Sequence, residues 1–378
     1  MLPSHASVVV IGGGVMGASA AFHLAEAGER GVLLLERGQL ASGSTSRAAG
    51  GVRAQFSDEL NIRLGARSLE AFADFGRRPG AEIDLRRAGY LFVLTRPEDV
   101  ETFERSIALQ NSLGVPSRLV SPSEARDLCP LLEVDDVLAA AWSPEDGHAT
   151  PEAVVQGYAA GARRCGAEIA TGVEVTGVEL AEGAGSSPAR ISAVLTSAGR
   201  VETSVVVCCA GAWSAPVGAM AGVELPVEAV ERRVRFTGGF DGLPDELPMT
   251  IDFATGFYFH REGPGLLMGI AGGGEDVETA LAEAAERRAP AVARAPLRGG
   301  WSGLYEMSPD HNALIGEAPH VERFLYATGF SGHGFLQGPA VGEIVRDLVL
   351  RRDPFVDIAP LSAERFERAA SRPERHVV

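Results

Sequence analysis

Three glycines near the start of the chain have the spacing of a phosphate-binding turn. Gly12, Gly14 and Gly17 form a G-x-G-x-x-G pattern directly after the apolar run 8–11. The first glycine allows a tight turn, the second lets the backbone approach a pyrophosphate, and the third lets the following helix pack closely on the strand. The expected helix, from about Met16 to Ala27, then directs its N-terminal amides at the phosphates.

An acidic residue completes this pattern. Glu36 ends a second apolar run and follows Gly17 by about 20 residues, the spacing at which a carboxylate accepts hydrogen bonds from an adenosine ribose. A G-x-G-x-x-G pattern alone is weak in a chain with 46 glycines, and a purely structural βαβ unit is the alternative. Strand, helix, strand and terminal acid together favour a dinucleotide site.

The composition narrows the class of protein. The chain has 378 residues, 46% of them apolar, which predicts a large core and roughly two domains. It has no apolar run of membrane-spanning length and no basic, signal-like start, so we expect a cytoplasmic protein. A net charge of −16 disfavours nucleic acid and anionic membrane as partners. The four cysteines lack metal-ligand spacing, and we expect them to be reduced and mostly buried. They are Cys129, Cys165, Cys208 and Cys209.

The chain contains no lysine, and all 34 basic residues are arginine. A codon bias toward arginine explains this most simply. The chemical consequence holds whatever the cause: no lysine can form a Schiff base, act as a base or anchor a substrate. Fixed positive charge in an active site must therefore come from arginine, histidine or a helix terminus.

The remaining pattern predicts alternating layers of structure. A polar, small-residue loop covers 41–53, near the carboxyl ends of the first strands, where ligands bind. The expected helices are 58–75, 97–114, 152–165, 277–293 and 339–350, and the expected strands include 90–94, 167–178, a hairpin at 194–200, 203–209, alternating runs within 227–270, and 324–328.

These elements predict an α/β fold plus antiparallel β structure. Residues 1–79, 143–216 and 301–366 are expected to form a discontinuous domain around a parallel sheet. Residues 80–142 and 217–300 are expected to form a second, mostly antiparallel domain, and 367–378 a disordered tail. Such interleaving is not typical of a nicotinamide dehydrogenase, whose cofactor domain is usually continuous.

Five segments spread over the chain resemble the D-amino acid oxidase superfamily of flavoproteins, and most of all its glycine oxidase and sarcosine oxidase β-subunit branch. The matching segments are 11–17, 43–53, 209–213, 303–310 and 329–335. The resemblance implies a Rossmann-like FAD-binding domain interleaved with a mostly antiparallel substrate-binding domain. The residues it implies for FAD binding are Gly12, Gly14, Val15, Met16, Gly17, Glu36, Arg37, Ser44, Thr45, Ala49, Gly50, Gly51, Val173, Gly211, Trp213, Gly332, His333, Gly334, Phe335 and Leu336.

Two positions bear on how the flavin is held and reoxidised. Gly303 stands where monomeric sarcosine oxidases carry the cysteine that attaches the flavin, so we expect non-covalent FAD. Leu267 stands where those enzymes place a lysine that helps oxygen accept its first electron, which favours a dehydrogenase over an oxidase.

The resemblance also supplies candidate catalytic residues. Arg53 aligns with an arginine that faces the substrate and would bind a carboxylate, although a surface arginine is the alternative. Tyr258 is expected in the pocket, with an ordinary core aromatic as its alternative. Tyr305 replaces a carboxylate-binding arginine of glycine oxidase, and Leu336 replaces a sarcosine oxidase lysine. His333 is as consistent with a structural role in the flavin turn as with catalysis; His260 and His311 are weaker candidates.

The implied function is FAD-dependent oxidation of the C–N bond of a secondary or N-substituted amino acid to an imine, by hydride transfer to flavin. Sarcosine, dimethylglycine, proline and opine-like compounds form the expected substrate set. The alternatives are oxidation of a primary amine or D-amino acid, an electron-passing subunit of a multi-protein amine dehydrogenase, and a non-catalytic FAD-binding assembly factor. The expected partners are a small-molecule substrate and an electron acceptor or partner subunit.

Overall fold

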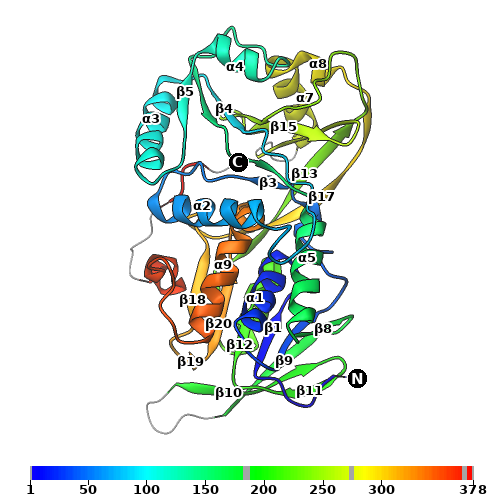
Figure 1. The fold of residues 1–378 in the computed structure, drawn as a ribbon, viewed down its shortest axis with the longest axis vertical. Helices are drawn as coiled ribbons and strands as arrows, with labels where there is room; N and C mark the ends of the chain where they lie inside the picture. Colours follow the sequence, from blue (N-terminus) through cyan, green and yellow to red (C-terminus); the bar gives the residue numbers. More distant parts are fainter. Residues whose placement is uncertain (1, 182–187, 272–275, 368–372, 377–378) are drawn as a thin grey trace.

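The computed structural model describes residues 2–181, 188–271, 276–367 and 373–376. Two large sheets lie one above the other along the long axis of the molecule (Figure 1). Helices α1, α5 and α9 accompany the lower sheet, and α3, α4, α7 and α8 lie around the upper one. No helix among these residues is long and apolar enough to cross a membrane.

The lower sheet has six strands in the order β18-β20-β12-β1-β2-β8. All of its pairs are parallel except β18 with β20. The apolar run predicted at 203–209 does return to this sheet, where β12 pairs with β1. The strands are β1 (Val8–Ile11), β2 (Val32–Glu36), β8 (Glu168–Thr171), β12 (Val206–Cys208), β18 (Leu314–Glu317) and β20 (Phe324–Thr328).

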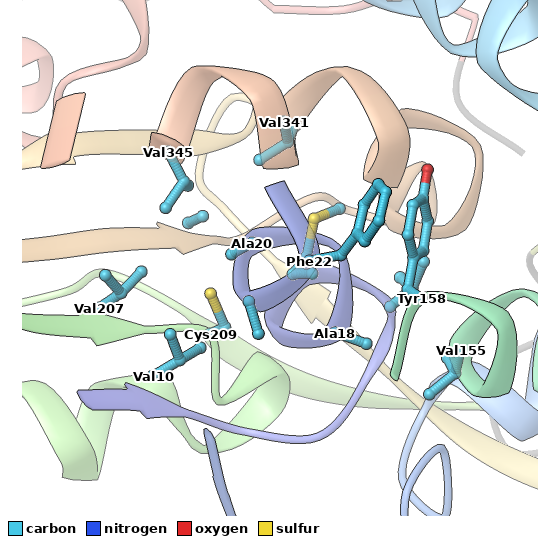
Figure 2. Packing of buried hydrophobic residues seen from close by; sticks show 14 of the residues in the cluster. Val10, Ala18, Ala20, Phe22, Val155, Tyr158, Val207, Cys209, Val341 and Val345 are labelled. Carbon is cyan, nitrogen blue, oxygen red and sulfur yellow. The ribbon is translucent and has the colours of Figure 1, made fainter. Parts of the chain in front are cut away.

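Three helices cover one face of this sheet: α1 (Val15–Glu26), α5 (Pro151–Arg164) and α9 (Gly334–Val349). Figure 2 shows Val10, Val207 and Cys209 of the sheet region beneath α1, with Val341 and Val345 of α9 above it. The helices approach closely because small residues face each other; a Cβ on Gly342 would lie 2.1 Å from Ser19 Oγ. This packing holds the start of α1 above the carboxyl end of β1.

The upper sheet has eight strands in the order β17-β13-β16-β15-β14-β4-β6-β5. Its pairs are antiparallel except β14 with β4, which confirms a mostly antiparallel second layer. β17 continues past the boundary expected at residue 301, because its pairing with β13 extends to Met307. The strands are β4 (Tyr90–Leu94), β5 (Arg118–Val120), β6 (Ala139–Ser143), β13 (Glu228–Thr237), β14 (Met249–Asp252), β15 (Phe257–Glu262), β16 (Gly265–Ile270) and β17 (Leu297–Met307).

Smaller elements complete the fold. The remaining strands are β3 (Gly51–Val52), β7 (Gly147–His148), β9 (Val175–Ala181), β10 (Ala189–Thr196), β11 (Gly199–Glu202) and β19 (Val321–Glu322). The remaining helices are α2 (Glu59–Ala73), α3 (Pro97–Ser112), α4 (Pro122–Leu128), α6 (Ser214–Ala219), α7 (Val277–Arg288) and α8 (Pro290–Ala293). As predicted, Asp58 caps α2, accepting hydrogen bonds from the amides of Leu60 and Asn61.

Three sequence predictions are wrong in detail. The last long helix begins at Gly334 rather than at Pro339. Pro339 has no backbone N–H and so removes one hydrogen bond of the helix, but the packing of Gly338 on Val15 of α1 outweighs that loss. The helix expected at 277–293 breaks at Ala289, before Pro290, a residue that disfavours helical conformation in its predecessor. In the tail expected to be disordered at 367–378, residues 373–376 are placed, with Glu374 and His376 buried; residues 368–372 and 377–378 lie outside the described residues.

Candidate active site

A cavity of about 690 Å³ lies between the two sheets, where the glycine turn, the 42–53 loop, β13, β17 and the start of α9 meet. Its size is in the usual range for small-molecule and cofactor sites. The residues expected to hold FAD that line it are Gly12, Gly14, Val15, Met16, Glu36, Arg37, Ser44, Thr45, Ala49, Gly50, Gly51, Val173, Gly211, Trp213, Gly332, His333, Gly334, Phe335 and Leu336. Arg53, Tyr258 and Tyr305 line it as well.

Gly17 is the one expected FAD residue that does not line the cavity. A Cβ at this position would lie 1.8 Å from the carbonyl oxygen of Gly12, so only glycine lets α1 sit so close to the turn. Gly12 has φ +111°, in the left-handed region, and a Cβ there would meet Cys209 O at 2.3 Å. These two glycines shape the turn, and the following residues face the cavity.

Two helices present their N-terminal amides to the cavity. α1 begins after Gly14 and α9 after His333; neither N-cap residue supplies a side-chain cap and neither first turn holds an acidic residue, although the Val15 amide of α1 donates to Thr45 Oγ1 at 3.2 Å. Uncapped amides and the positive end of the helix dipole stabilise negative charge. The donor set therefore fits FAD: α1 suits the pyrophosphate, and α9 suits the negative charge of a reduced flavin ring.

The end of β2 carries a fixed carboxylate. Glu36 accepts hydrogen bonds from the amides of Gly13 and Gly38, both at 2.7 Å. Beside it, the Arg37 guanidinium lies 4.1 Å from the ring centre of Trp213. A carboxylate held by the glycine turn itself suits the hydroxyls of an adenosine ribose, the role expected from its spacing.

Arg53 also lines the cavity and is only 3% exposed. Its guanidinium donates to the backbone oxygens of Gln55 and His376, the latter at 2.7 Å, and stands 4.2 Å from the ring centre of Phe56. Among the described residues, no carboxylate forms an ion pair with it. Burial lowers the pKa of Arg53, and the negative charges of Glu374 and Asp146 act against that effect without contacting the guanidinium. A buried cation with no carboxylate bonded to it is costly, so this group is suited to an anionic ligand.

His333 is held neutral beside this arginine. Burial and the positive charge of Arg53 lower the pKa of His333 to about 3. Its Nε2 lies 3.1 Å from Arg53 Nη2, and because a guanidinium can only donate, Nε2 is the acceptor. A neutral imidazole at this position can orient Arg53 and adds no positive charge to the site.

Tyrosines and apolar side chains of the upper sheet form the wall beside Arg53. Tyr90 and Tyr258 are buried, and burial raises the pKa of both hydroxyls. Met249 and Ile251 line the same wall. An enclosed, weakly polar wall favours the neutral form of an amine, which is the form that can lose a hydride.

Four residues at or beside the site had no role predicted from the sequence: Arg232, Glu306, Glu374 and His376. Arg232 of β13 and Glu306 of β17 line the cavity. Glu306 accepts from Thr328 Oγ1 at 2.9 Å, and its enclosed position raises its pKa to about 7. Glu374 accepts from Ser57 Oγ at 2.6 Å, and the ring of His376 stacks 4.1 Å from that of Phe103. Of these four residues, only Arg232 had a feature in the sequence that could have indicated its position. That feature is the strand-like, period-two alternation along 231–235.

The two weaker histidine candidates do not line the cavity. His260 is buried against His148, with ring centres 4.4 Å apart, and burial lowers its pKa to about 3. His311 lies in a turn with φ +63°. No group of three or more potential metal ligands occurs among the residues that the structure places.

Comparisons with known proteins agree with this geometry. The family described as "FAD dependent oxidoreductase" matches residues 7–348. Mouse mitochondrial sarcosine dehydrogenase (Mus musculus) is 29% identical over 97% of this chain and 42% of its own length. Rat mitochondrial dimethylglycine dehydrogenase (Rattus norvegicus) is 28% identical over 96% of this chain and 45% of its own. The chain thus spans less than half the length of these relatives.

Two solved structures cover the whole fold. L-proline dehydrogenase from P. horikoshii is 33% identical, with a TM-score of 0.91 over 98% of this chain and 100% of that one. Glycine oxidase from Geobacillus kaustophilus is 25% identical, with a TM-score of 0.83 over 96% of this chain and 99% of that one.

Proposed function

The chain belongs to the family of FAD-dependent oxidoreductases, and on this premise we propose that it oxidises the C–N bond of a secondary or N-substituted amino acid. The observation that carries the proposal is Arg53, a buried guanidinium that lines the cavity and forms no ion pair with a carboxylate among the described residues. A carboxylate on the substrate would supply that partner. Relatives named for sarcosine, dimethylglycine and proline support the same substrate class.

Bound FAD would supply the oxidation by accepting a hydride, leaving an imine that water hydrolyses. The protein's own part is binding, orientation and control of charge. Arg53 would hold the carboxylate and His333 would orient that arginine. Tyr90 and Tyr258 would exclude water from the amine and keep it unprotonated.

Two alternatives remain within this family. Similarity to glycine oxidase favours a primary amine or D-amino acid, but Tyr305 replaces the arginine expected there and removes that anchor. The chain could also pass electrons on as a subunit of a larger dehydrogenase. A screen of secondary, N-methylated and primary amino acids for anaerobic bleaching of the flavin band tests the proposal. Bleaching by primary amines alone would replace it with the alternative.

We further propose a reducing compartment such as the cytoplasm and an electron acceptor other than oxygen. The support for the compartment is that all four cysteines are free thiols, with the adjacent Cys208 and Cys209 both buried. Burial raises the pKa of each of these two thiols above its usual value. Such thiols behave as small apolar side chains rather than as reactive groups.

The flavin should be held without a covalent bond. The purified protein should be yellow, and acid precipitation should release all of its flavin into the supernatant. Gly303 offers no side chain to the flavin, and Cys209, which also lines the cavity, is kept protonated by burial. The absorbance of pellet and supernatant measures the outcome; flavin retained in the washed pellet would contradict the prediction.

Air should reoxidise the substrate-reduced enzyme slowly, and an artificial acceptor should do so fast. Leu267 is buried in the same apolar cluster as Tyr258, does not line the cavity and offers no cation, and the chain has no lysine to replace it. Arg53 lines the cavity, but in the proposed function its charge is bound to the substrate carboxylate. Because a preformed, unpaired positive charge stabilises superoxide as it forms, the absence of the lysine slows that step. Stopped-flow reoxidation in air-saturated buffer, compared with turnover on the best acceptor, provides the measurement. Equal rates would identify an oxidase.

A further inference from the structure

We infer that Arg232 is a second carboxylate-binding residue, and that the substrate is a dicarboxylic secondary amine with one carboxylate on each side of the nitrogen. The inference rests on the proposed function and narrows its substrate class. It comes from the position of Arg232 on β13, its lack of an ion pair among the described residues, and the cluster of side chains that it shares with Arg53.

The alternation of β13 directs Arg232 toward the cavity. Arg232 and Val234 line the cavity, whereas Glu231 and Arg233 between and beside them are exposed. Arg232 pairs across the sheet with Gly303 of β17, which also lines the cavity. The glycine leaves room for Arg47, whose Cβ would lie 2.8 Å from a Cβ on Gly303 and which also lines the cavity.

Arg232 differs from its neighbours in having no anionic partner. Arg233 pairs with Glu231 at 3.3 Å, and Arg235 pairs with Glu278. Within the described part of the chain, Arg232 forms no ion pair; its Nη1 donates only to the backbone oxygen of Glu231, at 3.3 Å, and its buried Nε has no hydrogen-bond partner. A buried donor left without a partner costs about 1–3 kcal/mol, so a ligand that accepts from Nε is favoured.

Tyr305 links the two arginines. The Arg232 guanidinium carbon lies 5.6 Å from the ring centre of Tyr305. The enclosed position of Tyr305 raises its pKa, and the positive charges of both Arg232 and Arg53 oppose that rise. The cavity therefore places two cations around one tyrosine, with the apolar side chains of Met249 and Ile251 on the same wall.

Two arginines that line one cavity and both act on Tyr305 suit an amine with a carboxylate at each end. One carboxylate would bind Arg53, the other Arg232, and the C–N–C unit would lie against the apolar wall. In the reaction, a C–H bond next to nitrogen breaks, its hydrogen and electron pair pass to FAD, nitrogen loses its proton, and a C=N bond forms. Water then hydrolyses the imine to a 2-oxo acid and an amino acid.

Binding of two ethers that cannot be oxidised tests the inference without turnover. Diglycolate has two carboxylates and methoxyacetate has one, and perturbation of the flavin absorbance gives a Kd for each. The holoenzyme should bind diglycolate about 10- to 100-fold more tightly, the value of one charged hydrogen-bonded contact. Arg232→Gln should abolish this preference and leave the Kd of methoxyacetate unchanged, while Arg53→Gln should weaken both ligands.

Matched variants control for folding and net charge. Arg233→Gln removes a positive charge from the exposed face of the same strand and should keep the preference. Arg232→Lys should retain most of it. Equal Kd values for the two ethers in the unaltered holoenzyme, or an unchanged preference in Arg232→Gln, would overturn the inference.

Measurements of turnover distinguish a failure of this inference from a failure of the proposed function on which it rests. Iminodiacetate should reduce the flavin with a higher kcat/KM than sarcosine or proline. If sarcosine or proline reduces the flavin but iminodiacetate is no better, the dicarboxylate inference fails and the proposed function stands. If no amino acid reduces the flavin, the proposed function itself fails.

Discussion

Replacing Arg53 by alanine should raise the transition-state free energy for an amino-acid substrate by about 2–5 kcal/mol, the cost of removing one partner of a buried, hydrogen-bonded charge pair. The effect is large because Arg53 is nearly inaccessible and forms no ion pair with a carboxylate among the described residues. The ratio of kcat/KM between the unaltered enzyme and the variant measures it. Pyrrolidine is proline without its carboxylate, so comparing the loss of rate on these two amines shows whether the carboxylate is responsible for the effect.

The carboxyl-free amine should lose far less rate than the amino acid. Arg63→Ala provides a matched control, since Arg63 is an exposed arginine of α2 paired with Glu59. Arg53→Ala also removes the bond to His376 O, so the melting temperature and flavin content of each variant should be compared. Equal losses on proline and pyrrolidine would remove Arg53 from the substrate site.

Gly17→Ala should give a protein with little bound FAD. The added methyl would lie 1.8 Å from Gly12 O, so α1 must move away from the turn or the turn must distort. Either change displaces the amides that would bind the pyrophosphate. We expect destabilisation of about 3 kcal/mol, the upper range for overpacking a tightly packed site.

The flavin-to-protein absorbance ratio and the urea unfolding midpoint measure this effect. Gly76→Ala is a suitable control, because its φ is ordinary and the nearest atom to its new Cβ, Glu82 Oε1, would lie at 3.5 Å. A Gly17→Ala protein with full FAD occupancy and an unchanged midpoint would show that close packing at this glycine does not shape the cofactor turn.

Local chemistry made much of this fold predictable. Residues 90–94 form the predicted strand, and the helix predicted at 97–114 covers Pro97–Ser112, since an apolar run and a proline-led amphipathic segment are each recognisable locally. The glycine turn and Glu36 also lie as their spacing indicated. The start of α9 was less predictable, because contact with α1 competes with the local preference of Pro339.

By itself, the sequence determined the cofactor class and the interleaved layers, because each depends on short patterns or on whole-chain resemblance, and it left Arg53 either at the substrate or on the surface. Only the tertiary structure decided what faces Arg53. His376 reaches it from the far end of the chain, and Arg232 enters the cavity because pairing with β17 fixes which face of β13 points inward. Contacts between residues so distant in sequence depend on how the two sheets stack, and no local pattern specifies that.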